Sequence, residues 1–483
     1  MTSDNAIQSA KYLFFANIVI MIINASVSIL IIKYFSVTEY GHYAYIFSFT
    51  IIFSLFSNLG FPGLLQKYLP KINIIESNLL INQLFYIQSS ILIALLIIFY
   101  FINVNFLFIE EHSAAVIIYI YFFVINSLIF RSYLSIKLEF RFLYILLIIL
   151  TFLKLILMYS LYIYNLFSIK NLLYILIGFE VILFSISFLK KINIVKYNRY
   201  LDKNSLYINS IPFVKEKLFD MFMTASVSIW FLKSFHAVEE IAYYVFVVSI
   251  SLLIANNISL LVRWEIIFTN FFIKTVEEVD ERLLLTLWYK GFLLIAIPVI
   301  IFLFIFSTDI SIFIFNDKYS DQMLYLNILI LLLFISHISY LYTPIIYKKD
   351  DLNVFAKYSF VASFVHISLI IIFGMMYGYV GCIFALGCAF SSKGIYLIYR
   401  YGLPIDLIST YKFSLKLSAI SLCAGLIVSS IVTSSTLLFL SLLMYLLIGL
   451  SMIYKIKMFS SKEKKLIEHK FINRKFGFIK EFI

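Results

Sequence analysis

The stretch from Tyr34 to Pro70 reads YFSVTEYGHYAYIFSFTIIFSLFSNLGFPGLLQKYLP. Apolar residues fill almost all of it between Tyr43 and Leu65. A nearly uncharged run of this length requires a hydrocarbon solvent and does not fit the core of a soluble protein. The stretch therefore predicts a transmembrane helix, and it sets the class of the whole fold.

Three helix breakers, Gly60, Pro62 and Gly63, lie inside the far end of this run. Such residues are tolerated in a membrane helix only where neighbouring helices cover the loosened backbone. We therefore predict that they form a packing or hinge site beside a part of the protein that moves.

The turn that precedes this run recurs 201 residues later in the chain. Residues 37–45 align without a gap on residues 238–246, so that Glu39 matches Glu240 and Tyr43 matches Tyr244. Each copy links two apolar runs. Duplicated halves are common in transporters, whose sites lie between the halves.

The composition excludes a soluble globular protein. The 483 residues are 63% hydrophobic and only 13% charged, with a mean hydropathy of +1.00. The three Cys lie in apolar runs and are read as small core residues. The six His are scattered, so the sequence predicts neither a metal site nor a cofactor.

The apolar runs predict an all-α integral membrane protein with about fourteen transmembrane helices, and twelve is the alternative. The predicted spans are residues 12–33, 43–66, 82–103, 114–130, 142–164, 171–189, 216–234, 241–262, 286–306, 323–345, 356–377, 380–400, 414–433 and 436–454.

Lys and Arg gather in alternate loops of this map, which places both termini on the cytoplasmic side. The net charge of +12 is therefore a topology signal, and nucleic-acid binding is the poorer interpretation because the charges are dispersed. The basic tail, residues 455–483, either lies on anionic lipid headgroups or is simply solvated.

No catalytic machinery is visible in the sequence. A nucleotide-binding lysine loop, a phosphorylated-aspartate motif and paired carboxylates at a membrane edge are all missing. The longest predicted outer loop, residues 307–322, is too short for a polysaccharide polymerase. We therefore expect a protein that is not an enzyme.

Charges inside predicted spans are the best pointers to function, because they are costly in hydrocarbon. Lys154 and Glu180 lie ~18 Å and ~14 Å along two successive antiparallel spans, at 1.5 Å per residue, so they can meet near the midplane. The pair either fixes helix packing, or Lys154 binds an anion in a cavity while Glu180 holds it or accepts a proton.

Other cations lie near the ends of spans, where most such side chains reach out to the interface. Lys290, Lys393 and Arg131 are further candidates for cavity cations that bind substrate. His337 and His366 lie within spans, where either a packing role or a proton relay fits the sequence.

Several short segments, taken in order, resemble the flippases of O-antigen and capsule synthesis, which belong to the multidrug/oligosaccharidyl-lipid/polysaccharide exporter superfamily. They are Val37-Thr38-Glu39-Tyr40-Gly41-His42-Tyr43-Ala44, Asn58-Leu59-Gly60-Phe61-Pro62, Gln66-Lys67-Tyr68-Leu69-Pro70, Ile211-Pro212-Phe213, Phe315-Asn316-Asp317-Lys318-Tyr319 and Tyr377-Gly378-Tyr379-Val380-Gly381.

The resemblance implies two six-helix lobes around a V-shaped central cavity, followed by two extra helices. The corresponding divisions are an N-terminal lobe, a cytoplasmic linker, a C-terminal lobe, two extra transmembrane helices and a cytoplasmic tail: 1–190, 191–215, 216–400, 401–454 and 455–483.

The resemblance also implies a substrate, a polyprenyl-pyrophosphate-linked oligosaccharide such as an O-antigen (lipopolysaccharide) or capsule repeat unit. It would be flipped across a bacterial inner membrane by alternating access. Membrane lipids, a polymerase and chain-length machinery would be the partners. The alternatives are a cation-coupled multidrug exporter or a lipid II flippase. The chain departs from the pattern at Ser226–Trp230, where many relatives carry an Asp, and at Ala242, where a Gly is expected.

Overall fold

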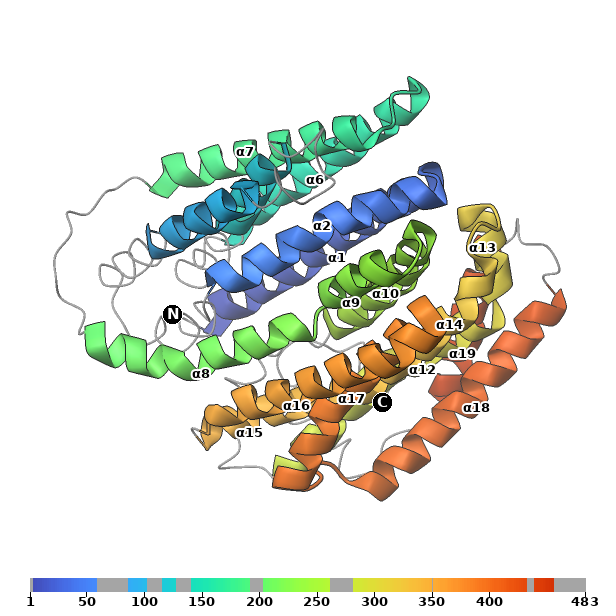
Figure 1. The fold of residues 1–483 in the computed structure, drawn as a ribbon. Helices are drawn as coiled ribbons and strands as arrows, with labels where there is room; N and C mark the ends of the chain where they lie inside the picture. Colours follow the sequence, from blue (N-terminus) through green and yellow to red (C-terminus); the bar gives the residue numbers. More distant parts are fainter. Residues whose placement is uncertain are drawn as a thin grey trace. The chain divides into compact units, whose positions relative to one another are not determined.

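The structure is a computed structural model of the chain, drawn in Figure 1. It describes residues 3–58, 86–101, 115–126, 140–191, 203–260, 281–349, 351–431 and 438–455. All regular structure in these residues is helical, and no strand occurs among them.

Eight helical stretches of the described residues are long and apolar enough to cross a membrane, and four shorter apolar helices accompany them. Helices suit this role because they satisfy all backbone polar groups internally. The chain is therefore a multi-pass, all-helical membrane protein, as the sequence predicts.

Figure 1 labels the helices α1 (Ser3–Tyr34), α2 (Val37–Asn58), α6 (Phe140–Ile163), α7 (Ile169–Lys191), α8 (Lys203–Phe222), α9 (Ala225–Phe235), α10 (Val238–Leu260), α12 (Glu281–Ile305), α13 (Ser307–Phe315), α14 (Met323–Ser336), α15 (Thr343–Lys348), α16 (Asn353–Leu369), α17 (Met375–Tyr401), α18 (Leu407–Ile431) and α19 (Leu438–Lys455). Short 3₁₀ segments at Ser320–Gln322 and His337–Tyr342 and a π-helical segment at Ile370–Gly374 lie between them.

Several predicted boundaries differ from the observed ones. The predicted outer loop 307–322 contains α13, which ends at Asn316 in a left-handed conformation. Helix α8 begins at Lys203, inside the predicted linker 191–215. The single span predicted at 216–234 is broken between α8 and α9. Neither glycine nor proline marks that break, so the local sequence gives no sign of it.

The internal repeat is visible in the helix boundaries. Helices α1 and α9 end 201 residues apart, at Tyr34 and Phe235, and α2 and α10 begin 201 residues apart, at Val37 and Val238. The two copies of the turn also touch, because the Thr38 hydroxyl donates to Glu239 Oε1 at 3.0 Å.

The matched acids of the repeat have different contacts. Glu39 completes a capping box, in which its Oε2 accepts from the Ser36 backbone N–H at 2.9 Å while its own N–H donates to Ser36 Oγ. Glu240 instead accepts from the backbone N–H of Tyr379 in α17, at 2.9 Å. The two copies of the repeat therefore share the position of the acid but differ in its hydrogen-bond partners.

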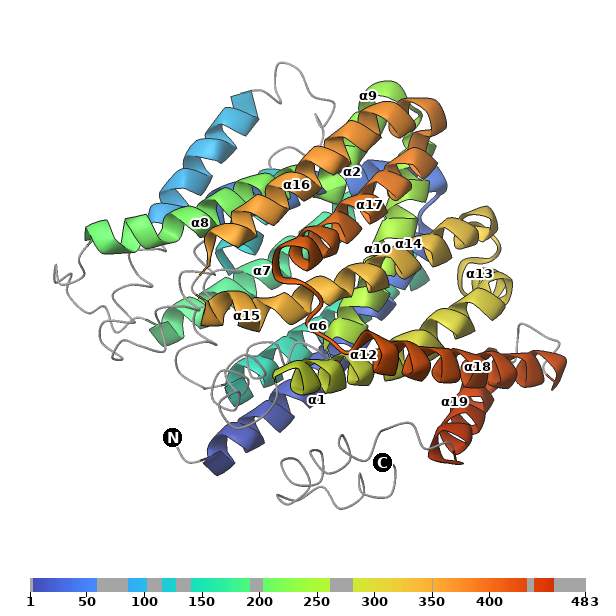
Figure 2. The same cartoon turned by 90° about the horizontal axis from the view of Figure 1, so that it is seen from below.

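The chain forms two compact units. Unit 1 comprises Met1–Phe246 and Leu352–Ala389, and unit 2 comprises Val247–Asp351 and Phe390–Ile483. Within unit 1, α1 lies along α6, α8 along α16, and α2 along α9 (Figures 1 and 2). The division into lobes given above remains a prediction.

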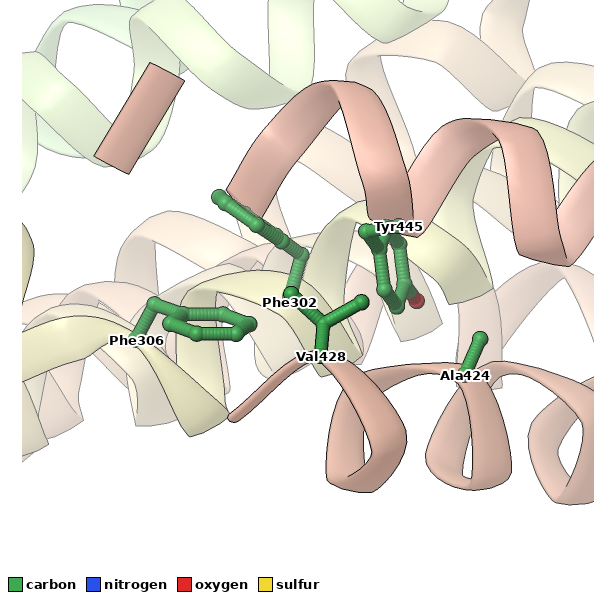
Figure 3. Packing of buried hydrophobic residues seen from close by; sticks show 5 residues of the cluster. All are labelled: Phe302, Phe306, Ala424, Val428 and Tyr445. Carbon is green, nitrogen blue, oxygen red and sulfur yellow. The ribbon is translucent and has the colours of Figure 1, made fainter. Parts of the chain in front are cut away.

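Within unit 2, α18 packs along α12 and against α19. Figure 3 shows the apolar cluster that joins these three helices, formed by Phe302, Phe306, Ala424, Val428 and Tyr445. A side chain at Gly425 would overlap Ile305, so the small residue permits the close approach of α18 to α12.

A turn at Gly378 divides the long helical stretch between Asn353 and Tyr401, with φ of 56° and ψ of −131°. This break agrees with the predicted boundary between the spans 356–377 and 380–400. The Glu240 carboxylate occupies the space where a Cβ of residue 378 would lie. Both the dihedral angles and the contact therefore require glycine.

We expect Gly378→Ala to lower the melting temperature of the purified protein in detergent, because the backbone strain alone costs about 1–3 kcal/mol. Gly291→Ala is the matched control, since no atom outside its own helix lies within 4 Å of the new Cβ. Equal melting temperatures for both variants would contradict this account of the turn.

Candidate functional site

The predicted pair Lys154 and Glu180 lies on neighbouring helices of unit 1, α6 and α7. Lys154 is about nine residues from each end of the candidate span Ile145–Ile163, which is ~14 Å at 1.5 Å per residue. The side chains of Lys154 and Glu180 are both partly buried and interact electrostatically. The structure therefore brings the two predicted residues together deep in the apolar part of unit 1.

Asn126 holds the acid of this pair. Its Nδ2 donates to Glu180 Oε2 at 2.8 Å and to the Glu180 carbonyl at 2.7 Å. Asn126 lies in the apolar helical stretch Ala115–Asn126 and is 3% exposed. The carboxylate is thus fixed by an amide, as expected for a polar group in a membrane span, which bonds between helices.

Lys154 makes no hydrogen bond and no direct ion pair with any residue that the structure describes. The Asn126 Oδ1 atom is buried and also lacks a partner among those residues. An ammonium and an amide oxygen are therefore available within one cluster. Such a pair can bind an anion that also carries hydroxyl groups, because the cation attracts the charge and the amide accepts from a hydroxyl.

Aromatic side chains extend from this cluster. Tyr119 lies seven residues before Asn126, on the same face of its helix, and interacts electrostatically with Glu180. Its ring packs edge-on against Phe47 of α2, with a centroid distance of 5.1 Å. Apolar faces with polar edges suit contact with sugar rings.

Lys290 lies in unit 2, on α12, and is 2% exposed. Its Nζ donates to Ser409 Oγ at 2.6 Å and lies 5.5 Å from the centre of the Phe413 ring. Both partners belong to α18. Contacts of this kind stabilise the packing of α12 against α18, and any role of Lys290 in a cavity remains a prediction.

The structure provides little information on the remaining predicted site residues. Lys393 is half-buried in α17. Four further residues lie outside the part of the chain that the structure describes: Arg131, Gly60, Pro62 and Gly63.

A second polar cluster of unit 1 was only partly anticipated. His366 in α16 lies 3.2 Å from Ser228 in α9, and both are fully buried. The sequence signal was available in the spacing of Ser359, Ser363 and His366, which places all three on one face of a helix. This spacing does not identify the partners of the three residues, however, because these partners lie at a break between two other helices, α8 and α9.

Comparisons with solved structures place this fold among known transporters. The chain is similar to "Lipid II flippase MurJ, inward closed conformation", with 18% identity, a TM-score of 0.64 and coverage of 92% of this chain and 98% of that chain. It is also similar to "MATE in the bent conformation", with 14% identity, a TM-score of 0.53 and coverage of 85% and 96%.

No protein-family model and no curated protein sequence matches the chain. At 18% and 14% identity, the likeness to MurJ and MATE establishes the fold and leaves the substrate open.

The geometry predicts different effects for Asn126 and Lys154 on stability. We expect Asn126→Ala to lower the melting temperature in detergent, because loss of both bonds leaves a buried carboxylate and costs about 1–3 kcal/mol. We expect Lys154→Met to leave it nearly unchanged, since the ammonium has no direct partner among the described residues.

Asn24→Ala, at an exposed position of α1, is the control for a change of asparagine as such. A large loss of stability in Lys154→Met, reversed in the double variant with Glu180→Gln, would show that the pair is structural.

Proposed function

We propose that the protein moves a polyprenyl-pyrophosphate-linked oligosaccharide from the cytoplasmic to the periplasmic leaflet of a bacterial inner membrane. The observation that carries the proposal is the Lys154 ammonium, deep in a candidate span and without a direct partner among the described residues. A buried ammonium that makes no hydrogen bond is expensive in hydrocarbon, and a bound anion would explain why it is retained beside Glu180.

The chemistry of this substrate matches the cluster. A pyrophosphate carries two or more negative charges and cannot cross hydrocarbon bare, so it needs a fixed counter-charge. Lys154 supplies that charge, and Asn126 Oδ1 accepts from a sugar hydroxyl. The polyprenyl tail remains in lipid while the two lobes rock about the site by alternating access.

We further propose an O-antigen or capsule repeat unit as the glycan, in keeping with the resemblance of the sequence segments. A polymerase and chain-length machinery would then receive the product. A lipid II flippase is the second candidate, supported by the TM-score of 0.64 against MurJ. A cation-coupled multidrug exporter has weaker support, because Lys154, which makes no hydrogen bond to a described residue, is basic and would repel a cation.

The export test replaces Lys154 in a strain whose surface polysaccharide depends on this gene. We expect Lys154→Ala to abolish surface polysaccharide at normal protein levels, and Lys154→Arg to retain a part of it because the charge remains. Glu180→Gln should be milder, since the cation stays in place.

Lys170→Ala is the matched control, because Lys170 is exposed at the start of α7. Full export by Lys154→Ala would end the proposed role of Lys154. Rescue of a strain depleted of its lipid II flippase, with no effect on surface polysaccharide, would favour the second candidate.

The proposed orientation has its own test. Reporter fusions after Lys203 and after Arg400 should report a cytoplasmic location, and a fusion at Asp317 should report a periplasmic one, because Lys and Arg are retained on the cytoplasmic side. Activity of a cytoplasmic reporter at Asp317 would overturn the fourteen-span map.

A further inference from the structure

The break between α8 and α9 leaves backbone carbonyls without helical partners inside a candidate span, Val214–Phe235. Helix α8 ends at Phe222 and α9 begins at Ala225, about midway along that span. Discontinuous membrane helices of this kind often bind ions through their freed carbonyls.

Helix α16 covers these carbonyls, and Figure 2 shows it running beside α8. The Ser363 hydroxyl donates to the Phe219 carbonyl, and His366 Nδ1 lies 2.8 Å from the Phe222 carbonyl. One turn away, Ser359 Oγ donates to Asp220 Oδ1 at 2.8 Å. A serine would satisfy a carbonyl as well as a histidine does, so helix capping alone does not explain an imidazole at 366.

The contacts of His366 fix its tautomer. The Phe222 carbonyl can only accept, so Nδ1 carries a proton, and Nε2 of the neutral ring accepts from Ser228 Oγ at 3.2 Å. When Nε2 gains a proton, it donates to the same oxygen, and the Ser228 hydrogen must turn to another acceptor. The hydrogen bond between His366 and Ser228 can therefore reverse its direction without moving any heavy atom.

Tyr244 supplies that acceptor. Its hydroxyl is fully buried in α10, interacts with Ser228, and has no hydrogen-bond partner of normal geometry among the described residues. A buried hydroxyl without a partner is costly unless it is used in another state. Tyr244, Ser228 and His366 thus form a chain that can carry a proton.

We propose that His366, with Ser228 and Tyr244 at the break between α8 and α9, is a proton-binding site that couples proton movement to transport. This inference rests on the proposed transport function. This site would bind a proton, whereas the Lys154 cluster would bind the lipid-linked anion.

The donor set suits a proton better than a metal ion. Sodium and other hard cations prefer several oxygen ligands, including carboxylates. The groups that contact His366 are one carbonyl and one hydroxyl, and the described residues contain no cluster of three metal-ligating side chains. An imidazole, in contrast, needs only one acceptor and one reversible donor or acceptor to hold its proton, and the two contacts of His366 supply these.

Titratable groups lie on both sides of His366. Towards the start of α8 these are Asp220, which is paired with Lys217 at 3.1 Å, and Glu216. Towards the Gly378 turn, the Cys382 thiol interacts with both Tyr244 and Glu240. Beyond them, His236 Nδ1 lies 3.5 Å from Glu240 Oε2. Under the predicted topology, these ends face the cytoplasmic and periplasmic sides.

Helix α9 connects the site to the first half of the chain. Trp230, two residues after Ser228, donates from Nε1 to Ser48 Oγ of α2 at 2.9 Å. Ser226, two residues before, donates to the Ser48 carbonyl at 3.0 Å. A change in the hydrogen bond of Ser228 therefore acts on the short helix that holds α2.

The proton site can be tested without the transported substrate. Trp264→Phe and Trp288→Phe leave Trp230 as the only tryptophan of the full chain. We expect its fluorescence in detergent to change sigmoidally between pH 4 and pH 8, and His366→Gln to abolish this change. Glutamine keeps a donor for the Phe222 carbonyl but does not titrate.

His337→Gln is the control, because His337 is a buried histidine of unit 2 whose Nδ1 also lies by a helix carbonyl, that of Leu333 at 2.6 Å. It should leave the titration unchanged. Should His366→Gln fail to fold, Ser228→Ala serves instead, since it spares the Phe222 contact and should shift the midpoint of the titration. An unaltered titration in a folded variant at either position would overturn the proposal.

Coupling is tested separately in proteoliposomes that contain a pH-sensitive dye and polyprenyl pyrophosphate as the probe. Polyprenyl pyrophosphate should change the internal pH with the wild-type chain and not with His366→Gln. If it has no effect on the wild type while the Trp230 titration still depends on His366, the proposed substrate fails and the proton site stands.

Discussion

In hydrocarbon, a backbone carbonyl or N–H without a partner costs several kcal/mol, and this penalty governs where polar side chains lie in the described part of this chain. Two interruptions of its membrane helices illustrate the rule. His366 and Ser363 satisfy the end of α8, and Glu240 satisfies the turn at Gly378 and Tyr379. In both cases, a polar residue of one helix is explained by a break in another.

Lys154 stands out against this background. Asn126 donates to the Glu180 carboxylate, and Lys290 donates to Ser409 and lies over the Phe413 ring. The Lys154 ammonium, in contrast, serves neither a backbone group nor a direct side-chain partner among the described residues. Among the described residues, Lys154 has only its electrostatic interaction with Glu180 and no hydrogen bond that explains its position. A bound anion would explain that position, and for this reason the proposed substrate site is centred on Lys154.

Much of the fold could be predicted from the sequence, because hydropathy and helix breakers are local signals. The boundary at Gly378 follows from them, and so do the two boundaries before α2 and α10, although these helices already begin at Val37 and Val238, earlier than the predicted spans 43–66 and 241–262. The α8–α9 break could not be predicted, since no local residue type marks Met223 and Thr224. The candidate site residues could be recognised as charged side chains inside predicted apolar spans. Their hydrogen-bonded neighbours Asn126 and Ser409 could not, because these contacts depend on helix packing that one sequence does not show.

The repeat carries a final consequence for mechanism. Glu39 caps its own helix, whereas Glu240 has no serine at residue 237 to complete such a box and reaches α17 instead. The two copies of the repeat thus place an acid at the same position but give it different contacts. The proposed sites follow the same asymmetry, with the substrate cation in the first copy and the proton-binding histidine in the second. A functional site assigned in one half therefore does not predict a site at the aligned position of the other half, because the contacts of each acid depend on residues outside the aligned segment.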